Sequence, residues 1–188
     1  MYNLHSILIQ LKKEDTPLHG VMVRCVRCFY QWLDPTLWEG SALFELWAQE
    51  LELIYGDLRQ RLSPNAKTDA GSLGDRFGFD TPPELPRLLQ SIQTFYSVLI
   101  KLIAWNTLRG ATPEPPLTEL LSGRAFVNRG IRNFCGDDWY IWPLDIWDPA
   151  LETQCEELRA CLESFDTCPE GSTLSPDSLS RIYEPVVP

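Results

Sequence analysis

The segment at residues 84–109 constrains the fold of this chain most. Its apolar side chains recur at three- and four-residue steps, which is the spacing of a helix, and they are Leu85, Leu88, Leu89, Ile92, Phe95, Tyr96, Leu99, Leu102 and Ile103. On a helix they cover more than half of the circumference, so other elements must pack around this one. The polar residues Arg87, Gln90, Gln93 and Lys101 interrupt the segment. They favour a core helix over a membrane span.

Weaker patterns predict further helices around this one. A helix is predicted at residues 20–33. It ends before Asp34-Pro35, because the residue before proline is pushed out of the helical region. Residues 36–62 carry a broad apolar stripe, and a short helix is expected at 117–122. A helix at 148–165 begins with Asp148-Pro149 as cap and first turn, and a last short helix follows residue 177.

Loops are expected between these helices, at residues 63–84 and 166–176, with a stiff proline-rich connection at 112–116. A short hairpin near residues 123–142 is an alternative for that part. The prediction is an all-α fold, an irregular helical bundle with long loops. Residues 1–188 fit a single helical domain, with a small C-terminal helical appendage at 148–188 as a variant.

The net charge and the N-terminal residues limit the partners and the cellular location that we expect for this chain. The formal net charge of −10 weighs against autonomous nucleic-acid binding; it indicates solubility, with an acidic mimic of nucleic acid as the lesser alternative. Residues 1–15 lack the pattern of a signal peptide, and the apolar stretch at 7–9 is soon followed by charged residues. We expect a cytoplasmic chain that is not bound to a membrane.

Cysteine and histidine spacing does not predict a metal site. Cys25 and Cys28 have the spacing of half a zinc site, but no second close pair follows among the other cysteines, and the only histidines are His5 and His19. Free, reduced thiols are the expectation.

The sequence also predicts no complete catalytic site and no bound cofactor. The glycines at 71, 74 and 78 lie between two helices, without the strand that a dinucleotide-binding turn requires. Neither histidine lies in a nucleophile–base motif. Asp137 and Asp138 precede Trp139 and Tyr140, and a small enzyme site there is the last-placed alternative, since such aromatics usually belong to the core.

Two segments are candidates for binding a partner. Residues 123–134 contain Arg124, Arg129 and Arg132 and no acid, a local reversal in an acidic chain. These arginines are candidates to contact phosphate or the acidic face of a partner; the alternative is pairing with the acids of the chain itself. The second candidate is the apolar C-terminus, where a free end is usually polar; the alternative is that it folds back onto the chain's own helices. The residues concerned are Leu179, Ile182, Tyr183, Val186 and Val187.

Several segments, in their order, resemble the helical region that precedes the catalytic domain of large bacterial N6-adenine DNA methylases from restriction and phage-defence systems. They are residues 46–56 (Leu-Trp-Ala-Gln-Glu-Leu-Glu-Leu-Ile-Tyr-Gly), 89–103 (Leu-Gln-Ser-Ile-Gln-Thr-Phe-Tyr-Ser-Val-Leu-Ile-Lys-Leu-Ile), 130–134 (Gly-Ile-Arg-Asn-Phe), 139–147 and 179–188. In that family a segment like the last leads into a Gly-x-Tyr-Tyr-Thr-Pro-type stretch that opens the methyltransferase domain.

The motifs of that family that this sequence lacks determine which function we expect. The Asn-Pro-Pro-Tyr-type catalytic motif and the Gly-rich cofactor site of the family are absent from this sequence, so the resemblance transfers no catalytic residue. It implies a non-catalytic accessory subunit or domain that positions a methyltransferase, another defence-system subunit, or DNA through the assembly. The chain would then be either part of a larger methylase or a separate subunit. An unrelated helical adaptor or regulatory protein is the alternative.

Overall fold

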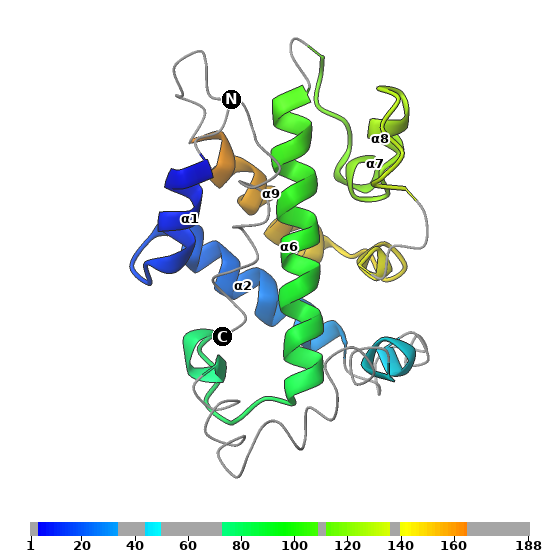
Figure 1. Ribbon diagram of the computed structural model, residues 1–188. Coiled ribbons are helices and arrows are strands. Elements are labelled where there is room, and N and C mark those ends of the chain that lie inside the picture. Colours follow the sequence, from blue (N-terminus) through cyan, green and yellow to red (C-terminus); the bar gives the residue numbers. More distant parts are fainter. Residues whose placement is uncertain (1–3, 34–43, 50–72, 109–111, 136–139, 165–188) are drawn as a thin grey trace.

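A computed structural model describes residues 4–33, 44–49, 73–108, 112–135 and 140–164 of the chain (Figure 1). Of these residues 71% are helical, and none of them lies in a strand. The predicted all-α class is confirmed. The hairpin alternative is wrong for residues 123–135 and 140–142, which form short helices and turns instead.

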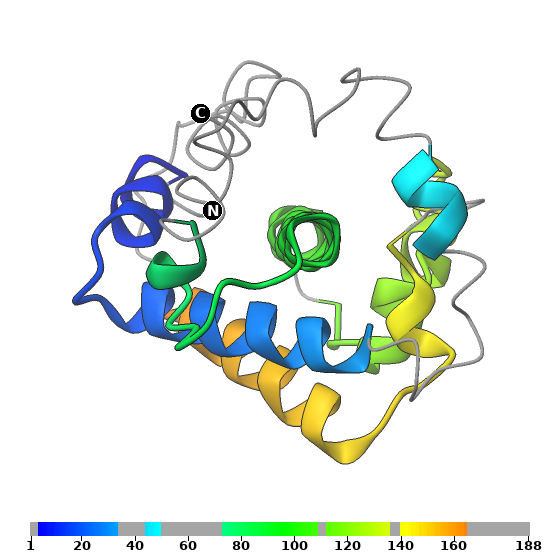
Figure 2. The same ribbon diagram turned by 90° about the horizontal axis from the view of Figure 1, so that it is seen from below.

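Helix α6 (Leu85–Leu108) lies at the centre of the molecule, as its apolar pattern predicts. Helices α2 (Pro17–Trp32) and α9 (Pro149–Glu163) run antiparallel and side by side, and α6 lies across them (Figures 1 and 2). The short helices α7 (Leu117–Leu121) and α8 (Arg124–Val127) lie on another side of α6.

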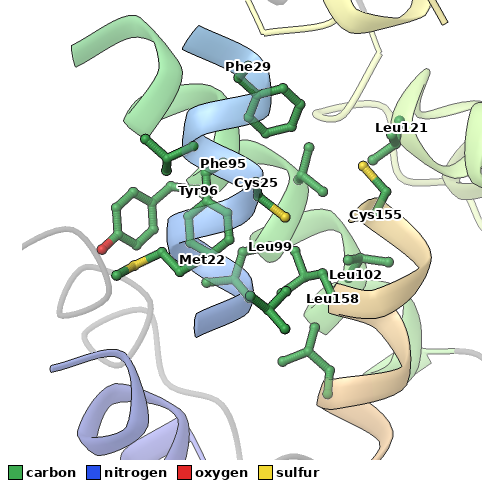
Figure 3. Packing of buried hydrophobic residues seen from close by; sticks show 14 of the residues in the cluster. Met22, Cys25, Phe29, Phe95, Tyr96, Leu99, Leu102, Leu121, Cys155 and Leu158 are labelled. Atoms are coloured by element: carbon green, nitrogen blue, oxygen red, sulfur yellow. The ribbon is translucent and has the colours of Figure 1, made fainter. Parts of the chain in front are cut away.

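The core is formed where α2, α6 and α9 meet (Figure 3). From α2 come Met22, Cys25 and Phe29, and from α9 come Cys155 and Leu158, all of them buried. They pack against the buried face of α6, which includes Phe95, Tyr96, Leu99 and Leu102. The three helices therefore share one apolar core.

Several polar side chains of α6 are also buried, and hydrogen bonds offset the cost of their burial. Thr94 donates from Oγ1 to the Gln90 carbonyl at 2.8 Å, and Ser91 donates from Oγ to the Arg87 carbonyl at 2.7 Å. Lys101 donates from Nζ to the Leu121 carbonyl at 2.9 Å, at the C-terminal end of α7. A cation is favourable at a helix C-terminus, so Lys101 ties α7 to α6.

Helix α6 is the one helix among the described residues that is long and apolar enough to cross a membrane. Its most apolar window is 72% buried inside the protein. The structure thus uses its apolar surface for packing against α2, α7 and α9.

The first turn of α2 begins earlier than the predicted residue 20. Thr16 is the N-cap, and its hydroxyl accepts from the His19 amide at 3.3 Å, with Pro17 in the first turn. Threonine followed by proline is a helix-start signal that the apolar periodicity alone does not reveal.

Helix α1 (Leu4–Lys12) has no counterpart in the prediction. Its Ile7 and Leu11 are buried four residues apart, and α1 packs against α2. A nine-residue helix is marginal in isolation, so tertiary packing rather than local sequence stabilises it.

The predicted start of α9 is confirmed. Asp148 is the N-cap, and its Oδ1 accepts from the Leu151 amide at 2.8 Å. Leu151, Leu158 and Leu162 are fully buried. This helix is the described part of the predicted C-terminal unit at 148–188, and it packs in the same core as α2 and α6.

The prediction of a loop over residues 63–84 is wrong at residues 73–76, which are helical. Phe77 follows them at 3% exposure and belongs to the core. A Cβ at Gly74 would lie 2.5 Å from Pro83 Cδ, so this glycine permits the close return of the chain. Residues 44–49 are helical as predicted, and the rest of the predicted helix at 36–62 lies outside the described residues.

Trp142 links three parts of the core. It is fully buried, at the start of the 3₁₀ helix η1 (Trp142–Leu144), as expected for the aromatic segment. Its ring packs edge-on against Phe29 of α2, with the centroids 5.9 Å apart. Its Nε1 donates to Thr94 Oγ1 of α6 at 2.9 Å.

Replacing Thr94 with valine tests this link. Valine keeps the shape of threonine but leaves the buried Trp142 N–H without this acceptor, which costs about 1–3 kcal/mol of unfolding free energy. Thr107→Val is the matched control, because Thr107 makes the same back-bond in α6, to the Ile103 carbonyl at 2.9 Å. Urea unfolding should show the large loss for Thr94→Val alone; equal losses would contradict the role of Trp142.

Candidate partner-binding surface

The arginine segment at residues 123–134 folds into a compact turn on the C-terminal half of α6. Phe126 is fully buried, and its ring centroid lies 5.8 Å from Trp105 of α6 and 4.5 Å from Phe134. Gly123 has a φ of 79°, and a Cβ there would lie 2.0 Å from the Phe134 carbonyl oxygen. The two ends of the turn therefore meet at a glycine that no other residue can replace without displacement of the backbone.

Backbone hydrogen bonds hold the turn after α8. The amides of Arg129 and Ile131 both donate to the Phe126 carbonyl, at 2.9 and 3.1 Å. The Gly130 amide donates to the Val127 carbonyl at 2.9 Å, and Gly130 has a φ of 76°. This places the side chains of residues 124, 127, 129 and 132 at the surface, where all four are exposed.

Arg129 binds within the chain. Its Nη1 donates to the Leu108 carbonyl at 3.0 Å, its Nη2 to the Thr112 hydroxyl, and its guanidinium lies 5.8 Å from the ring centroid of Trp105. It therefore closes the C-terminal end of α6 against the turn, and this contact uses much of its hydrogen-bonding capacity.

Arg124 and Arg132 differ from Arg129. Both are exposed, and neither makes a side-chain hydrogen bond or ion pair, counted over the part of the chain that the structure describes. Within that part, neither arginine pairs with an acid of the chain. Elsewhere such pairing does occur: Arg24 binds Glu157 at 2.7 Å, and Arg159 lies 3.9 Å from Glu114.

Two exposed apolar side chains accompany these arginines. Val127 of α8 is 44% exposed, and Leu108, which follows Trp105 by one turn of α6, is 37% exposed. Sequence reasoning did not single out either residue, although an apolar residue between arginines on an acid-free segment was a usable signal. We call the exposed side chains of Arg124, Val127 and Arg132, together with Leu108 at the end of α6, whose carbonyl binds Arg129 of the turn, the arginine surface.

The other candidate residues lie outside the described residues. These are Leu179, Ile182, Tyr183, Val186 and Val187 of the C-terminus, and the acid pair Asp137 and Asp138. They stay predictions, and the arginine surface is the candidate for which geometry is defined.

Three thiols come close together between α2 and α9. Cys25 donates to the Gln154 carbonyl at 3.5 Å, with Cys28 and Cys155 nearby. Burial raises the pKa of Cys28 to about 11 and that of Cys155 to about 12, and it raises the pKa of Cys25 well above its usual value. These cysteines are protonated at neutral pH, the state in which a thiol is a poor nucleophile and a poor metal ligand.

His19 has a structural contact of its own. It is 6% exposed, and its Nδ1 lies 3.0 Å from the Leu11 carbonyl, which joins α2 to α1. Within the described ranges, no group of three or more His, Cys, Asp or Glu side chains is arranged to hold a metal ion.

Comparison with known proteins gives no match: no family model, no curated protein and no solved structure is similar to this chain.

The geometry of the turn predicts different effects at its two left-handed glycines. Gly130→Ala adds only a strained backbone, because nothing lies within 4 Å of the new Cβ, and should cost about 1–2 kcal/mol. Gly123→Ala adds the same strain and a clash with the Phe134 carbonyl, so it should cost clearly more. Thermal unfolding measures both. Equal losses would show that the turn does not close at Gly123.

The raised thiol pKa values predict slow modification. Below pH 9 an ordinary thiol is partly ionised, whereas Cys25 and Cys155 stay protonated and buried until the pH approaches their raised pKa values. Ellman's reagent at pH 8 should modify them only after guanidinium unfolding, with mass spectrometry of peptides identifying the sites. Rapid modification of either residue in the folded protein would contradict the packing of α2 on α9.

Proposed function

We propose that this chain is a non-catalytic helical accessory subunit or domain of a bacterial DNA-modification or phage-defence system. In this role it binds an adenine methyltransferase module or another subunit and positions it, or DNA through the assembly. The observation that carries the proposal is the arginine surface, where Arg124 and Arg132 lack partners within the described part of an acidic chain. Arginine is enriched at protein–protein interfaces relative to the rest of the surface.

The order of the segments that resemble the methylase helical region supports the choice of system. Three of these segments lie wholly or almost wholly in the described residues: residues 89–103 lie in α6 at the core, residues 130–134 form the second half of the turn that carries Arg132, and residues 140–147 include η1 with the buried Trp142. In this proposal the first supplies the scaffold and the second shapes the binding surface.

An unrelated helical adaptor is the second candidate. It would use the same arginine surface, and it differs only in the identity of its partner. The genes beside that of this chain separate the two, because the methylase proposal expects an adjacent reading frame that encodes the Tyr-Tyr-Thr-Pro-type stretch and the Asn-Pro-Pro-Tyr-type motif.

Co-expression with that adjacent methyltransferase tests the proposal. The two proteins should elute together in size-exclusion chromatography, and titration calorimetry of this chain alone with S-adenosylmethionine should show no binding heat. A neighbouring methyltransferase that elutes separately, or a stoichiometric heat with the cofactor, would contradict the proposal. The absence of any methylase gene nearby would favour the adaptor.

A further inference from the structure

We propose that the arginine surface binds an acidic segment of a partner protein, one in which carboxylates flank an apolar side chain. The inference rests on the partner-binding part of the proposed function, but not on the partner being a methylase. It names the chemistry that Arg124, Val127 and Arg132 recognise.

The charge argument comes from comparing the arginines of the described residues. Five of them bind within the chain: Arg24, Arg27, Arg87, Arg129 and Arg159 bind carboxylates, backbone carbonyls or aromatic rings. Three are exposed without such a partner: Arg76, Arg124 and Arg132. Two of these three lie on the same acid-free turn, with the exposed Val127 between them in sequence. Counted over the described residues, the turn thus carries two arginines that no acid neutralises, on a protein of net charge −10.

The turn also holds its backbone in place before any partner arrives. The close contact of Gly123 with Phe134, the buried Phe126 and the bonds to its carbonyl fix the backbone from which Arg124 and Arg132 project. A fixed backbone lowers the conformational entropy lost on binding. Guanidinium groups then favour carboxylates, because their planar forks pair with both oxygens.

The apolar residues favour a protein segment over nucleic acid. Nucleic-acid affinity grows with the number of phosphates neutralised, and two free arginines on an acidic protein neutralise few. Val127 is exposed on the same short helix as Arg124, and Leu108, whose carbonyl binds Arg129 of the turn, is also exposed; phosphate groups would leave these apolar side chains without a contact. A protein segment with one apolar side chain between carboxylates can pair with the two arginines and also cover the exposed apolar side chains.

Fluorescence anisotropy at two salt concentrations tests this inference in the full chain. The probe is a labelled helical peptide of glutamate, leucine and alanine, and the comparison probes are its glutamine analogue and a mixed-sequence DNA duplex. We expect saturable binding of the glutamate peptide that weakens as salt rises, because exposed charges are screened. The glutamine analogue and the duplex should bind more weakly.

Charge reversal locates the site. Arg124→Glu combined with Arg132→Glu should weaken the peptide at least about tenfold, as expected when attraction becomes repulsion at two positions. Arg76→Glu is the matched control: Arg76 is also exposed and has no partner among the described residues, but the helical turn at residues 73–76 that carries it lies on the opposite side of α6 from α8 (Figures 1 and 2). It should change the affinity less than about twofold, since long-range charge is screened. Circular dichroism checks that each variant keeps its helix content.

Four results would overturn the inference. They are equal weakening by Arg76→Glu and by the double variant, tighter binding of the duplex than of the peptide, no binding of the glutamate peptide, or dimerisation of the free chain that the double variant abolishes. The last result would assign the surface to a second copy of the chain. If a methylase co-elutes with the chain but the peptide does not bind, only this inference is contradicted. If the peptide binds but no methylase co-elutes, only the proposed methylase partner is contradicted.

Discussion

The burial of α6 is the constraint on which the rest of the structure depends. Thirteen of its 24 residues are buried, far more than one neighbouring helix could cover. Helices α2 and α9 cover part of this surface and α7 covers another part, so their positions follow from the need to remove apolar area from water. Because α6 is apolar around most of its circumference, it also carries the polar contacts that orient its neighbours.

These polar contacts give each neighbour a defined place. At the N-terminal end of α6, Arg87 donates to the Tyr30 and Gln31 carbonyls at 2.7 and 3.2 Å and stacks on the Tyr30 ring, which binds the end of α2. In the middle, Thr94 binds Trp142 and Lys101 binds the end of α7. At the C-terminal end, Trp105 supports Phe126 and Arg129. The arginine surface is therefore built on the last turns of the central helix.

The sequence predicted the elements that have a strong local signal and missed those that depend on tertiary contacts. The apolar period of α6 and the Asp-Pro start of α9 are local, and both predictions were accurate. Helix α1 has apolar residues at helical spacing, at positions 4, 7, 8 and 11, but it is only nine residues long, and the helical turn at 73–76 has a single apolar residue, Leu73. Both are stabilised by burial of Ile7, Leu11 and Phe77 against other elements. Elements this short give too few periodic residues for the sequence pattern alone to predict them.

The same distinction applies to the candidate site. The absence of acids in residues 123–134 was visible in the sequence, and it singled out the three arginines together. Only the structure separates them, because the contacts of Arg129 with Leu108, Thr112 and Trp105 join residues about 20 positions apart. The exposure of Val127 depends likewise on Phe126 being the neighbour that turns inward.

Native-state hydrogen exchange tests most directly whether α6 is the element on which the others depend. If it is, the amides of residues 92–103 exchange only through global unfolding, with a free energy equal to that from urea denaturation, while amides of α8 exchange through smaller local openings. Amides of α6 that exchange as easily as those of α8 would contradict this account, because the core would then open without unfolding of the whole domain.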